Sequence, residues 1–144
     1  MIKLVRGDLN ALQRAGMGAM LVLDVHAQFI VEQMIKNQVS SLNDFLWTSQ
    51  LRYCWEGLTE LDGDPYNGDE GTDLDCFCKQ TNTRFRYGYE YLGNGPRLVI
   101  TPLTDKCYMT LTGALHSNYG GNPQGPAGTG KTETTKDLAK ALAI

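Results

Sequence analysis

The first quarter of the chain carries hydrophobic residues at the spacing of a helix. In residues 2–12 they recur at intervals of three and four, which places them on one helical face. A second, broader stripe runs from about residue 19 to 37. Gly16 and Gly18 lie between the stripes, and a glycine destabilises a helix interior by about 1 kcal/mol relative to alanine. The pattern predicts two helices with a break at these glycines.

The next apolar segment begins with a polar start signal. Ser41 followed by Asp44 is typical of a helix N-terminus, where a hydroxyl accepts from free backbone N–H groups and a carboxylate lies near the positive end of the dipole. We expect a short helix from Asn43 to Trp55. Its large apolar side chains predict that it is buried; they are Phe45, Leu46, Trp47, Leu51, Tyr53 and Trp55.

From Cys76 the hydrophobic period changes to that of a strand. Aromatic residues occupy every second position from Phe85 to Tyr91, which is the alternation of a strand with one packed face. Residues 81–83 (Thr-Asn-Thr) precede them as a turn. The pattern predicts a β-hairpin, which the glycine- and proline-rich residues 93–96 close.

Two further elements are predicted beyond the hairpin. Residues 97–101 are apolar and β-branched, which predicts a short strand that Pro102 ends. Thr104 is a suitable cap for a helix that begins at Asp105 and continues through Leu115.

Residues 56–75 differ in composition from the rest of the chain. They hold eight of its 16 acidic residues, four of its glycines and no Lys or Arg. Repulsion between the carboxylates favours a solvated loop over a packed element. An EF-hand calcium loop is the alternative, but Tyr66 stands where that loop requires Asp or Asn. We therefore expect a solvated loop.

Composition and charge narrow the class of protein. The 144 residues are 42% hydrophobic, 20% charged and 9% aromatic, as in a soluble single domain. Arg84 and Arg86 alternate with aromatic residues as in a single-strand nucleic-acid platform, but a net charge of -3 argues against that partner. No signal peptide is recognisable, and the longest apolar run, residues 15–23, is far shorter than a membrane span. We expect a soluble intracellular protein without a membrane or nucleic-acid partner.

The four cysteines are candidate metal ligands; they are Cys54, Cys76, Cys78 and Cys107. One Cys-x-Cys pair without a second closely spaced pair is a weak zinc signal. Buried thiols at strand positions are commoner. The spacing favours reduced structural thiols over a zinc site or a disulfide scaffold.

The strongest motif is Gly125-Pro126-Ala127-Gly128-Thr129-Gly130-Lys131-Thr132, which matches the Walker A phosphate loop at every position. Its glycines let backbone N–H groups converge on phosphate oxygens. Lys131 supplies positive charge to the β- and γ-phosphates, and the Thr132 hydroxyl ligates Mg²⁺. A helix predicted from about Lys131 to Ala143 directs its positive end at the anion. ATP and Mg²⁺ are therefore the expected cofactors.

Both flanks of this loop depart from an ordinary P-loop enzyme. Residues 118–124 are polar and glycine-rich, so we expect a short or irregular strand where a buried apolar one is usual. Only twelve residues follow Thr132, with Leu138, Ala139 and Leu142 on the apolar face of the helix. Such enzymes need a second acidic site on a neighbouring parallel strand. We expect no catalytic residue within this chain, and expect those acids to lie outside it.

Four segments resemble dynein heavy chains: Trp47-Thr48-Ser49-Gln50-Leu51-Arg52-Tyr53, Tyr87-Gly88-Tyr89-Glu90-Tyr91-Leu92-Gly93-Asn94, Arg97-Leu98-Val99-Ile100-Thr101-Pro102-Leu103-Thr104-Asp105, and the phosphate loop with Glu133 and Thr134. The resemblance covers nearly all of the chain except residues 57–75. Residues 79–85 look more like axonemal than cytoplasmic dyneins. Two departures are the acidic insertion and Cys54, which stands where the family often carries a second aromatic residue.

The resemblance implies an α/β fold with two parts. Residues 1–86 would be the C-terminal part of the dynein linker, a helical segment that carries the acidic loop 56–75. Residues 87–144 would be the N-terminal part of the first AAA+ ATPase module, with a β-hairpin between the linker helices and the P-loop region. The resemblance also implies that residues 125–132 hold the phosphates. Leu98, Val99, Ile100 and Pro102 would lie on the adenine side.

The implied function is that of the ATP-binding part of a microtubule minus-end-directed motor, in which ATP binding and hydrolysis drive linker movement. The implied partners are the rest of the motor ring, dynein intermediate and light chains, and microtubules. The implied location is the cytoplasmic cytoskeleton, in the axoneme of a cilium or flagellum. The alternative is a non-catalytic structural or interaction fragment that binds no nucleotide without the rest of the ring. We expect the isolated chain to hydrolyse no ATP above background.

Overall fold

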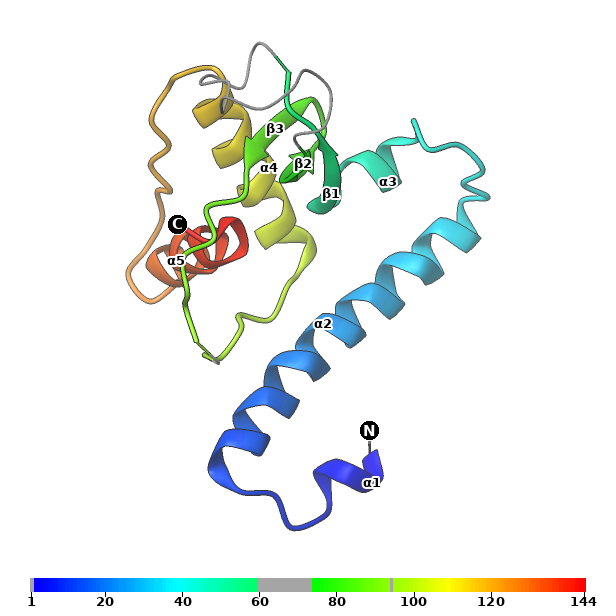
Figure 1. Ribbon diagram of the computed structural model, residues 1–144, viewed down its shortest axis with the longest axis vertical. Coiled ribbons are helices and arrows are strands. Elements are labelled where there is room, and N and C mark those ends of the chain that lie inside the picture. The colour runs from blue at the N-terminus through cyan, green and yellow to red at the C-terminus, as the bar shows by residue number, and fades with distance from the viewer. Residues whose placement is uncertain (1, 60–73, 94) are drawn as a thin grey trace.

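A long helical arm leads into a body made of a sheet and two helices (Figure 1). The computed structural model describes residues 2–59, 74–93 and 95–144. The elements in chain order are α1 (Ile2–Val5), α2 (Ala11–Lys36), α3 (Phe45–Thr48), β1 (Arg52–Gly57), β2 (Leu74–Gln80), β3 (Thr83–Arg86), α4 (Pro102–His116) and α5 (Lys131–Leu142). The expected mixture of helices and strands is present, and the body positions the phosphate-loop motif at the start of α5.

The N-terminal helices break at a different place from the predicted one. α2 runs without interruption through Gly16 and Gly18, so the predicted glycine break was wrong. The helix starts instead at Ala11, after the N-cap Asn10. The Asn10 side chain accepts from the Gln13 N–H at 2.8 Å, while the Gln13 side chain accepts from the Asn10 N–H at 3.0 Å. This reciprocal capping box fixes the helix start. Two glycines cost about 1 kcal/mol each, which is too little to interrupt so long a helix.

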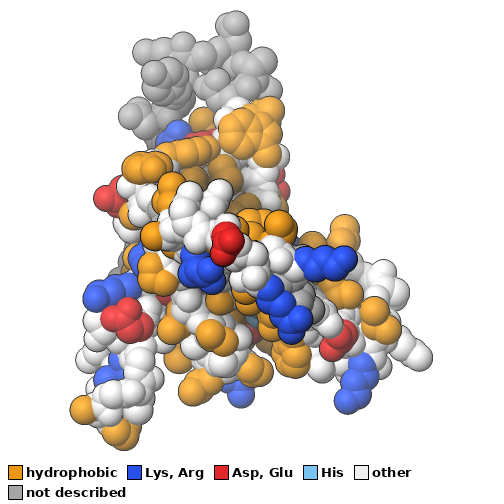
Figure 2. Space-filling model, turned by 90° about the horizontal axis from the view of Figure 1, so that it is seen from below, with side chains coloured by type: hydrophobic (Ala, Val, Ile, Leu, Met, Phe, Trp, Pro, Cys, Tyr) orange, Lys and Arg blue, Asp and Glu red, His pale blue; other side chains and the backbone are white. Residues whose placement is uncertain are grey.

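The surface of α2 is unusually apolar. None of its 26 residues is buried. Its Leu12 and Ile35 are 68% and 72% exposed. Figure 2 shows other hydrophobic side chains exposed among basic and acidic ones on the face seen from below. In the part of the chain that the structure describes, α2 is the one helix long and apolar enough to cross a membrane, a property that the count of consecutive apolar residues missed.

The segment predicted as one helix from Asn43 to Trp55 forms a single helical turn followed by a strand. Asp44 does cap a helix, since its side chain accepts from the Leu46 N–H at 2.8 Å. That helix ends after four residues, and the chain from Arg52 onward pairs with β2. The prediction of a 13-residue helix was therefore wrong. The prediction of burial was also wrong, because Trp55 is 64% exposed within this chain.

The sheet has three antiparallel strands in the order β1-β2-β3. The predicted hairpin is confirmed: β2 and β3 are joined by Thr81 and Asn82, and Gln80 pairs with Thr83 across the turn. β3 ends at Arg86, so the aromatic alternation continues beyond the strand. β1, which was not predicted as a strand, pairs along its whole length with β2.

Two acids of the predicted loop 56–75 lie in strands. Residues 60–73 lie outside the described residues, whereas Glu56 lies in β1 and Asp75 in β2. Glu56 accepts from Lys79 Nζ at 2.6 Å, and Asp75 pairs with Arg86 and accepts from the Tyr89 hydroxyl at 2.6 Å. These partners from the neighbouring strand and the chain after it offset the repulsion between carboxylates, so both acids are accommodated in strands.

α4 begins three residues earlier than predicted. Thr101, not Thr104, is the cap, and the two threonines form a capping box with Pro102 in the first turn. Residues 97–101 contain no strand, so that prediction was wrong. The core joins the sheet to α4 and α5 and consists of Cys78, Tyr108, Leu111, Leu138 and Leu142. The phosphate-loop helix is thus part of the body's core.

Candidate nucleotide-binding site

The phosphate-loop motif lies at the surface, between α4 and α5. Residues 117–130 contain no strand, so the short or irregular strand expected before the loop is absent. Gly128 and Gly130 have φ angles of 78° and 77°, in the left-handed region that strains other residues. The glycines of the motif are therefore required by the backbone itself. α5 follows directly from Lys131, as predicted.

The start of α5 has the features of an anion site. Its N-cap is Gly130, and no side chain makes a capping hydrogen bond there. The backbone N–H groups of a first helical turn have no partner inside the helix. Together with the helix dipole, they favour a negatively charged ligand such as a phosphate. The Thr132 side chain is exposed in this same turn.

Lys131 places its positive charge over the loop. Its Nζ donates to the Pro126 carbonyl oxygen and to Thr129 Oγ1, the latter at 3.2 Å. Thr129 Oγ1 in turn donates to the Pro126 carbonyl oxygen at 2.9 Å. All of these groups are at the surface, where a phosphate can replace the carbonyl as the partner of the lysine. The residues present thus fit a phosphate ligand.

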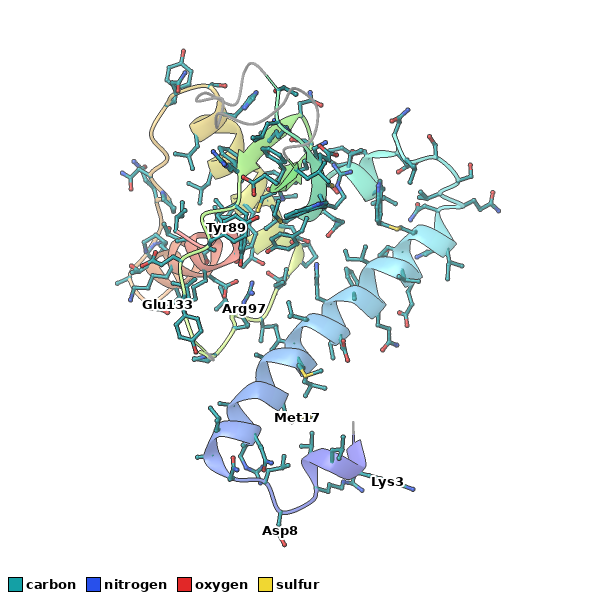
Figure 3. All side chains as sticks on the ribbon, viewed as in Figure 1. Lys3, Asp8, Met17, Tyr89, Arg97 and Glu133 are labelled. Atoms are coloured by element: carbon teal, nitrogen blue, oxygen red, sulfur yellow. The ribbon has the colours of Figure 1, made fainter. Side chains whose placement is uncertain are left out.

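The buried face of α5 is anchored by a carboxylate. Asp137 is 3% exposed and accepts from the Tyr108 hydroxyl at 2.7 Å. Arg97 approaches its two oxygens at 3.1 and 3.3 Å, and the Leu98 N–H donates to it at 3.2 Å. Figure 3 shows Arg97 on the segment that runs beside α5, where Glu133 is labelled. Burial alone would raise the pKa of Asp137, but these hydrogen bonds hold it below its usual value.

The C-terminal end of α5 is held by residues far away in the sequence. The Tyr53 hydroxyl of β1 donates to the Ala141 carbonyl oxygen at 2.9 Å. The Gly88 and Glu90 N–H groups donate to the carbonyl oxygens of Leu142 and Ala143 at 2.9 and 3.0 Å. Burial is the main cause that raises the pKa of Tyr53 to about 12, so its hydroxyl stays a donor at neutral pH. These contacts were not predicted from the sequence.

The residues expected on the adenine side divide between two places. Leu98 lies beside α5, through its N–H bond to Asp137. Val99, Ile100 and Pro102 line an apolar groove against α2, and Val99 is 65% exposed. The structure thus brings Leu98 next to the phosphate-loop helix and turns its neighbours toward the arm. Their role toward a base stays a prediction.

The thiols are separate from this site. In the described ranges all four cysteines are free, and no group of three or more His, Cys, Asp or Glu side chains is placed to hold a metal ion. Burial is the main cause that raises the pKa of Cys78 to about 11, so this thiol stays protonated. Of the predicted site residues, Thr132 alone offers a metal ligand, and it needs a bound nucleotide to complete the shell.

Comparison with known proteins agrees with this geometry. The family described as "Hydrolytic ATP binding site of dynein motor region" matches residues 87–144. Dynein axonemal heavy chain 1 of Homo sapiens is 55% identical over 144 residues, all of this chain and 3% of the relative. Dynein axonemal heavy chain 3 of Mus musculus is 54% identical over 142 residues, 99% of this chain and 3% of the relative.

The matches differ from the resemblance seen in the sequence in how much of the chain they cover, and they cover only a small part of each relative. The first alignment includes the acidic stretch, which the resemblance seen in the sequence left out. The chain spans about 3% of the length of the curated relatives that it matches. Residues 87–144 match the ATP-binding region described for that family, and the phosphate-loop motif lies within them. Along its whole length, therefore, the chain has the sequence of a segment of a dynein heavy chain.

Proposed function

We propose that residues 125–132 bind the triphosphate of ATP together with Mg²⁺, as the nucleotide site of a dynein motor. One observation carries this proposal: a loop with left-handed glycines ends at a helix N-terminus that no side chain caps, with the Lys131 ammonium over the loop. Backbone N–H groups and a lysine in this arrangement bind phosphate oxygens. The match to an ATP-binding family supports the choice of ATP over other phosphates.

Each residue of the loop has a separate task. The first-turn N–H groups of α5 and the Lys131 ammonium offset the negative charge of the phosphates. The Thr132 hydroxyl is the one Mg²⁺ ligand that the motif supplies. Leu98, Val99, Ile100 and Pro102 offer apolar surface to the adenine. The bound Mg²⁺ supplies charge neutralisation at the phosphates, and the remaining acidic groups for hydrolysis come from outside this chain.

We further propose that residues 1–86 are the end of the linker and that residues 87–144 begin the first AAA+ module. The apolar surface of α2 supports a role for the arm as a packing element, because none of its residues is buried in this chain. A membrane is a poor partner for α2, since Asp24 lies at its middle and an acidic residue there costs about 3 kcal/mol. The rest of the heavy chain is the better partner.

The setting follows from the relatives and is proposed by analogy with them. The proteins named above are axonemal dynein heavy chains. We propose that this chain likewise works in the cytoskeleton of a cilium or flagellum, in a motor that walks toward microtubule minus ends. Its partners there would be the motor ring, intermediate and light chains, and microtubules, with nucleotide state moving the linker.

The test of the site is Lys131→Ala in the whole heavy chain. Binding of radiolabelled ATP should weaken about tenfold or more, because charge-assisted contacts to phosphate are lost. Lys106→Ala is the matched control, since Lys106 is an exposed lysine on α4. The control should bind ATP as the wild type does. Unchanged ATP affinity in the Lys131→Ala protein would contradict the assignment.

The second candidate is a structural or interaction fragment that binds no nucleotide on its own. The exposed apolar face of α2 favours it, because such a face requires a partner. An antibody against residues 1–37 on a denaturing gel of whole cells separates the two. A single very large species supports the motor, whereas a band near 15.9 kDa supports the fragment.

The purified chain should hydrolyse no ATP above background, and Lys131-dependent turnover by it would contradict the expected absence of catalytic residues.

A further inference from the structure

Asp137 joins three parts of the body that are separate in the sequence. It belongs to α5, while its partners come from α4 (Tyr108) and from the segment before α4 (Arg97 and Leu98). Both of its oxygens are engaged, and the residue is 3% exposed. A carboxylate accepts about four hydrogen bonds, and Asp137 receives four here. It therefore has no capacity left to act on a ligand directly.

The same hydrogen bonds place the segment 97–102 relative to the phosphate loop. α5 begins at the loop, so whatever holds Arg97 and Leu98 to α5 also sets their position relative to the phosphates. The loop has contacts of its own that do not involve Asp137. Lys131 and Thr129 bind the Pro126 carbonyl oxygen, and Thr134 Oγ1 donates to the Gly130 carbonyl oxygen at 2.8 Å. Loss of the Asp137 contacts would thus release the segment and leave the loop in place.

We propose that Asp137 is a positioning residue that sets the base side of the nucleotide site, by tying the Arg97 side chain and the Leu98 backbone N–H to the phosphate-loop helix. This inference rests on the proposed function, in which the segment from Leu98 to Pro102 meets the adenine. Asp137 touches neither the phosphates nor the base. Its effect is on the nucleoside part of the ligand, because that part alone contacts the tied segment.

The charge of Asp137 allows a positioning role to be distinguished from a simple electrostatic effect on ligand affinity. Removing a negative charge near an anion site should strengthen phosphate binding, if charge alone mattered. Positioning predicts the opposite for ATP. Asparagine has the size of aspartate, but it keeps only one acceptor oxygen and has no negative charge, so two of the four hydrogen bonds lose their acceptor. Asp137→Asn therefore weakens the tie with little change in volume.

The experiment compares ATP with inorganic tripolyphosphate, which has the phosphates but no base. Binding of each radiolabelled ligand to the whole heavy chain is measured by equilibrium dialysis, counting only the binding that Lys131→Ala removes. Asp137→Asn should weaken ATP binding about tenfold, the effect of losing a hydrogen bond to a charged group. The affinity for tripolyphosphate should stay within about twofold of the wild-type value, because this ligand has no base to contact the tied segment. A twofold change corresponds to a free energy of RT ln 2, well below that of one such hydrogen bond.

Two further variants are measured beside Asp137→Asn, one as a milder change to the same contacts and one as a control for charge. Tyr108→Phe removes one hydroxyl donor to Asp137 and keeps the ring, so it should weaken ATP binding in the same direction but less. Glu133→Gln removes a negative charge from the same helix, where Glu133 pairs with Lys136 alone among the described ion pairs. It should not weaken the binding of either ligand.

The outcomes test the role of Asp137 and the proposed function separately. Equal losses for ATP and tripolyphosphate in Asp137→Asn would overturn the inference, because the whole site would then have been disturbed. Unchanged ATP binding in both Asp137→Asn and Tyr108→Phe would overturn it as well, while leaving the proposed function intact. If Lys131→Ala removes no binding of either ligand, the proposed function fails and the inference fails with it.

Discussion

Two helices of this molecule, α2 and α5, differ in how much of their surface is buried. α2 has 26 residues, is rich in apolar side chains, and buries none of them. α5 has 12 residues, of which a larger fraction is polar, and buries five: Thr134, Asp137, Leu138, Ala141 and Leu142. Hydrophobic content therefore does not decide which helix is packed. What decides it is whether the chain supplies a matching surface, and here it supplies one to α5 alone.

The two helices are also stabilised differently. α2 relies on local devices such as the Asn10–Gln13 capping box. α5 has no side-chain cap at its start and is held by distant groups, including Asp137's partners and the Tyr53 hydroxyl. Substitutions in α5 should therefore affect the free energy of unfolding of the whole body. Substitutions in α2 should affect the helix itself.

The largest expected contrast compares apolar truncations in the two helices. Leu138 is 4% exposed in the core, so Leu138→Ala should lower the free energy of unfolding by about 2–5 kcal/mol. Ile35→Ala is the matched control in α2, where Ile35 is 72% exposed, and it should change that free energy by no more than about 0.5 kcal/mol. Urea unfolding of the chain, followed by tryptophan fluorescence, measures both. Equal losses would show that α2 is packed in solution.

The next effect concerns the polar anchor of α5 and its pH dependence. Asp137→Asn should destabilise the chain by about 1.5–3 kcal/mol at pH 7, the range for hydrogen bonds to a charged group. The folded pKa of Asp137 lies below its ordinary value of 3.8. Its ionised form therefore contributes stability above that value, and the contribution is lost as the pH falls through the folded pKa. Urea unfolding of both proteins at pH 7 and below pH 4 should show the difference shrinking in acid; a difference that grew would contradict the sign.

A third test addresses the C-terminal anchor of α5. A Cβ at Gly88 would lie 2.2 Å from the Ala143 carbonyl oxygen, so Gly88→Ala should cost about 1–3 kcal/mol of unfolding free energy. Gly57→Ala is the control, since a Cβ there meets no atom within 4 Å. The same urea titration reads out both variants. If Gly88→Ala is as stable as the control, the chain at residues 88–90 is not seated on α5.

The smallest expected effect is a gain in α2. A Cβ at Gly18 meets nothing within 4 Å, so Gly18→Ala should stabilise the helix by about 1 kcal/mol through propensity alone. Thermal melting followed by circular dichroism at helical wavelengths measures it. A loss of helix signal would indicate that the arm bends at Gly18, as the sequence pattern first predicted.

The sequence predicted the structural features that residues close together in the chain specify. The phosphate-loop motif, the helix after it and the β2–β3 hairpin were all identified, because each is specified by residues a few positions apart. The helix predicted for residues 43–55 failed because its aromatic residues satisfy a strand as well as a helix. Only pairing with β2 decides between them, and that pairing depends on a partner more than twenty residues away.

The candidate site was predictable to the same extent. The motif alone predicts residues 125–132 as a phosphate site. Asp137 and Tyr53 could not, because Asp137 occupies a position on an apolar helix face where sequence patterns predict a hydrophobic residue. Its partners, Arg97 and Tyr108, lie 40 and 29 residues away. A buried carboxylate beside an apolar stripe is the one local signal that would have drawn attention to it.

The bond between Tyr53 and Ala141 spans 88 residues, which has a consequence for the order of folding. Contacts of such long range form late, because the intervening chain must first be brought together at a cost in entropy. During synthesis, β1 and the β2–β3 hairpin emerge from the ribosome well before α5 does. The sheet must therefore wait, with the core-facing Cys78 uncovered, until α5 has been synthesised. The helix proposed to bind phosphate is thus also the one that covers this part of the core.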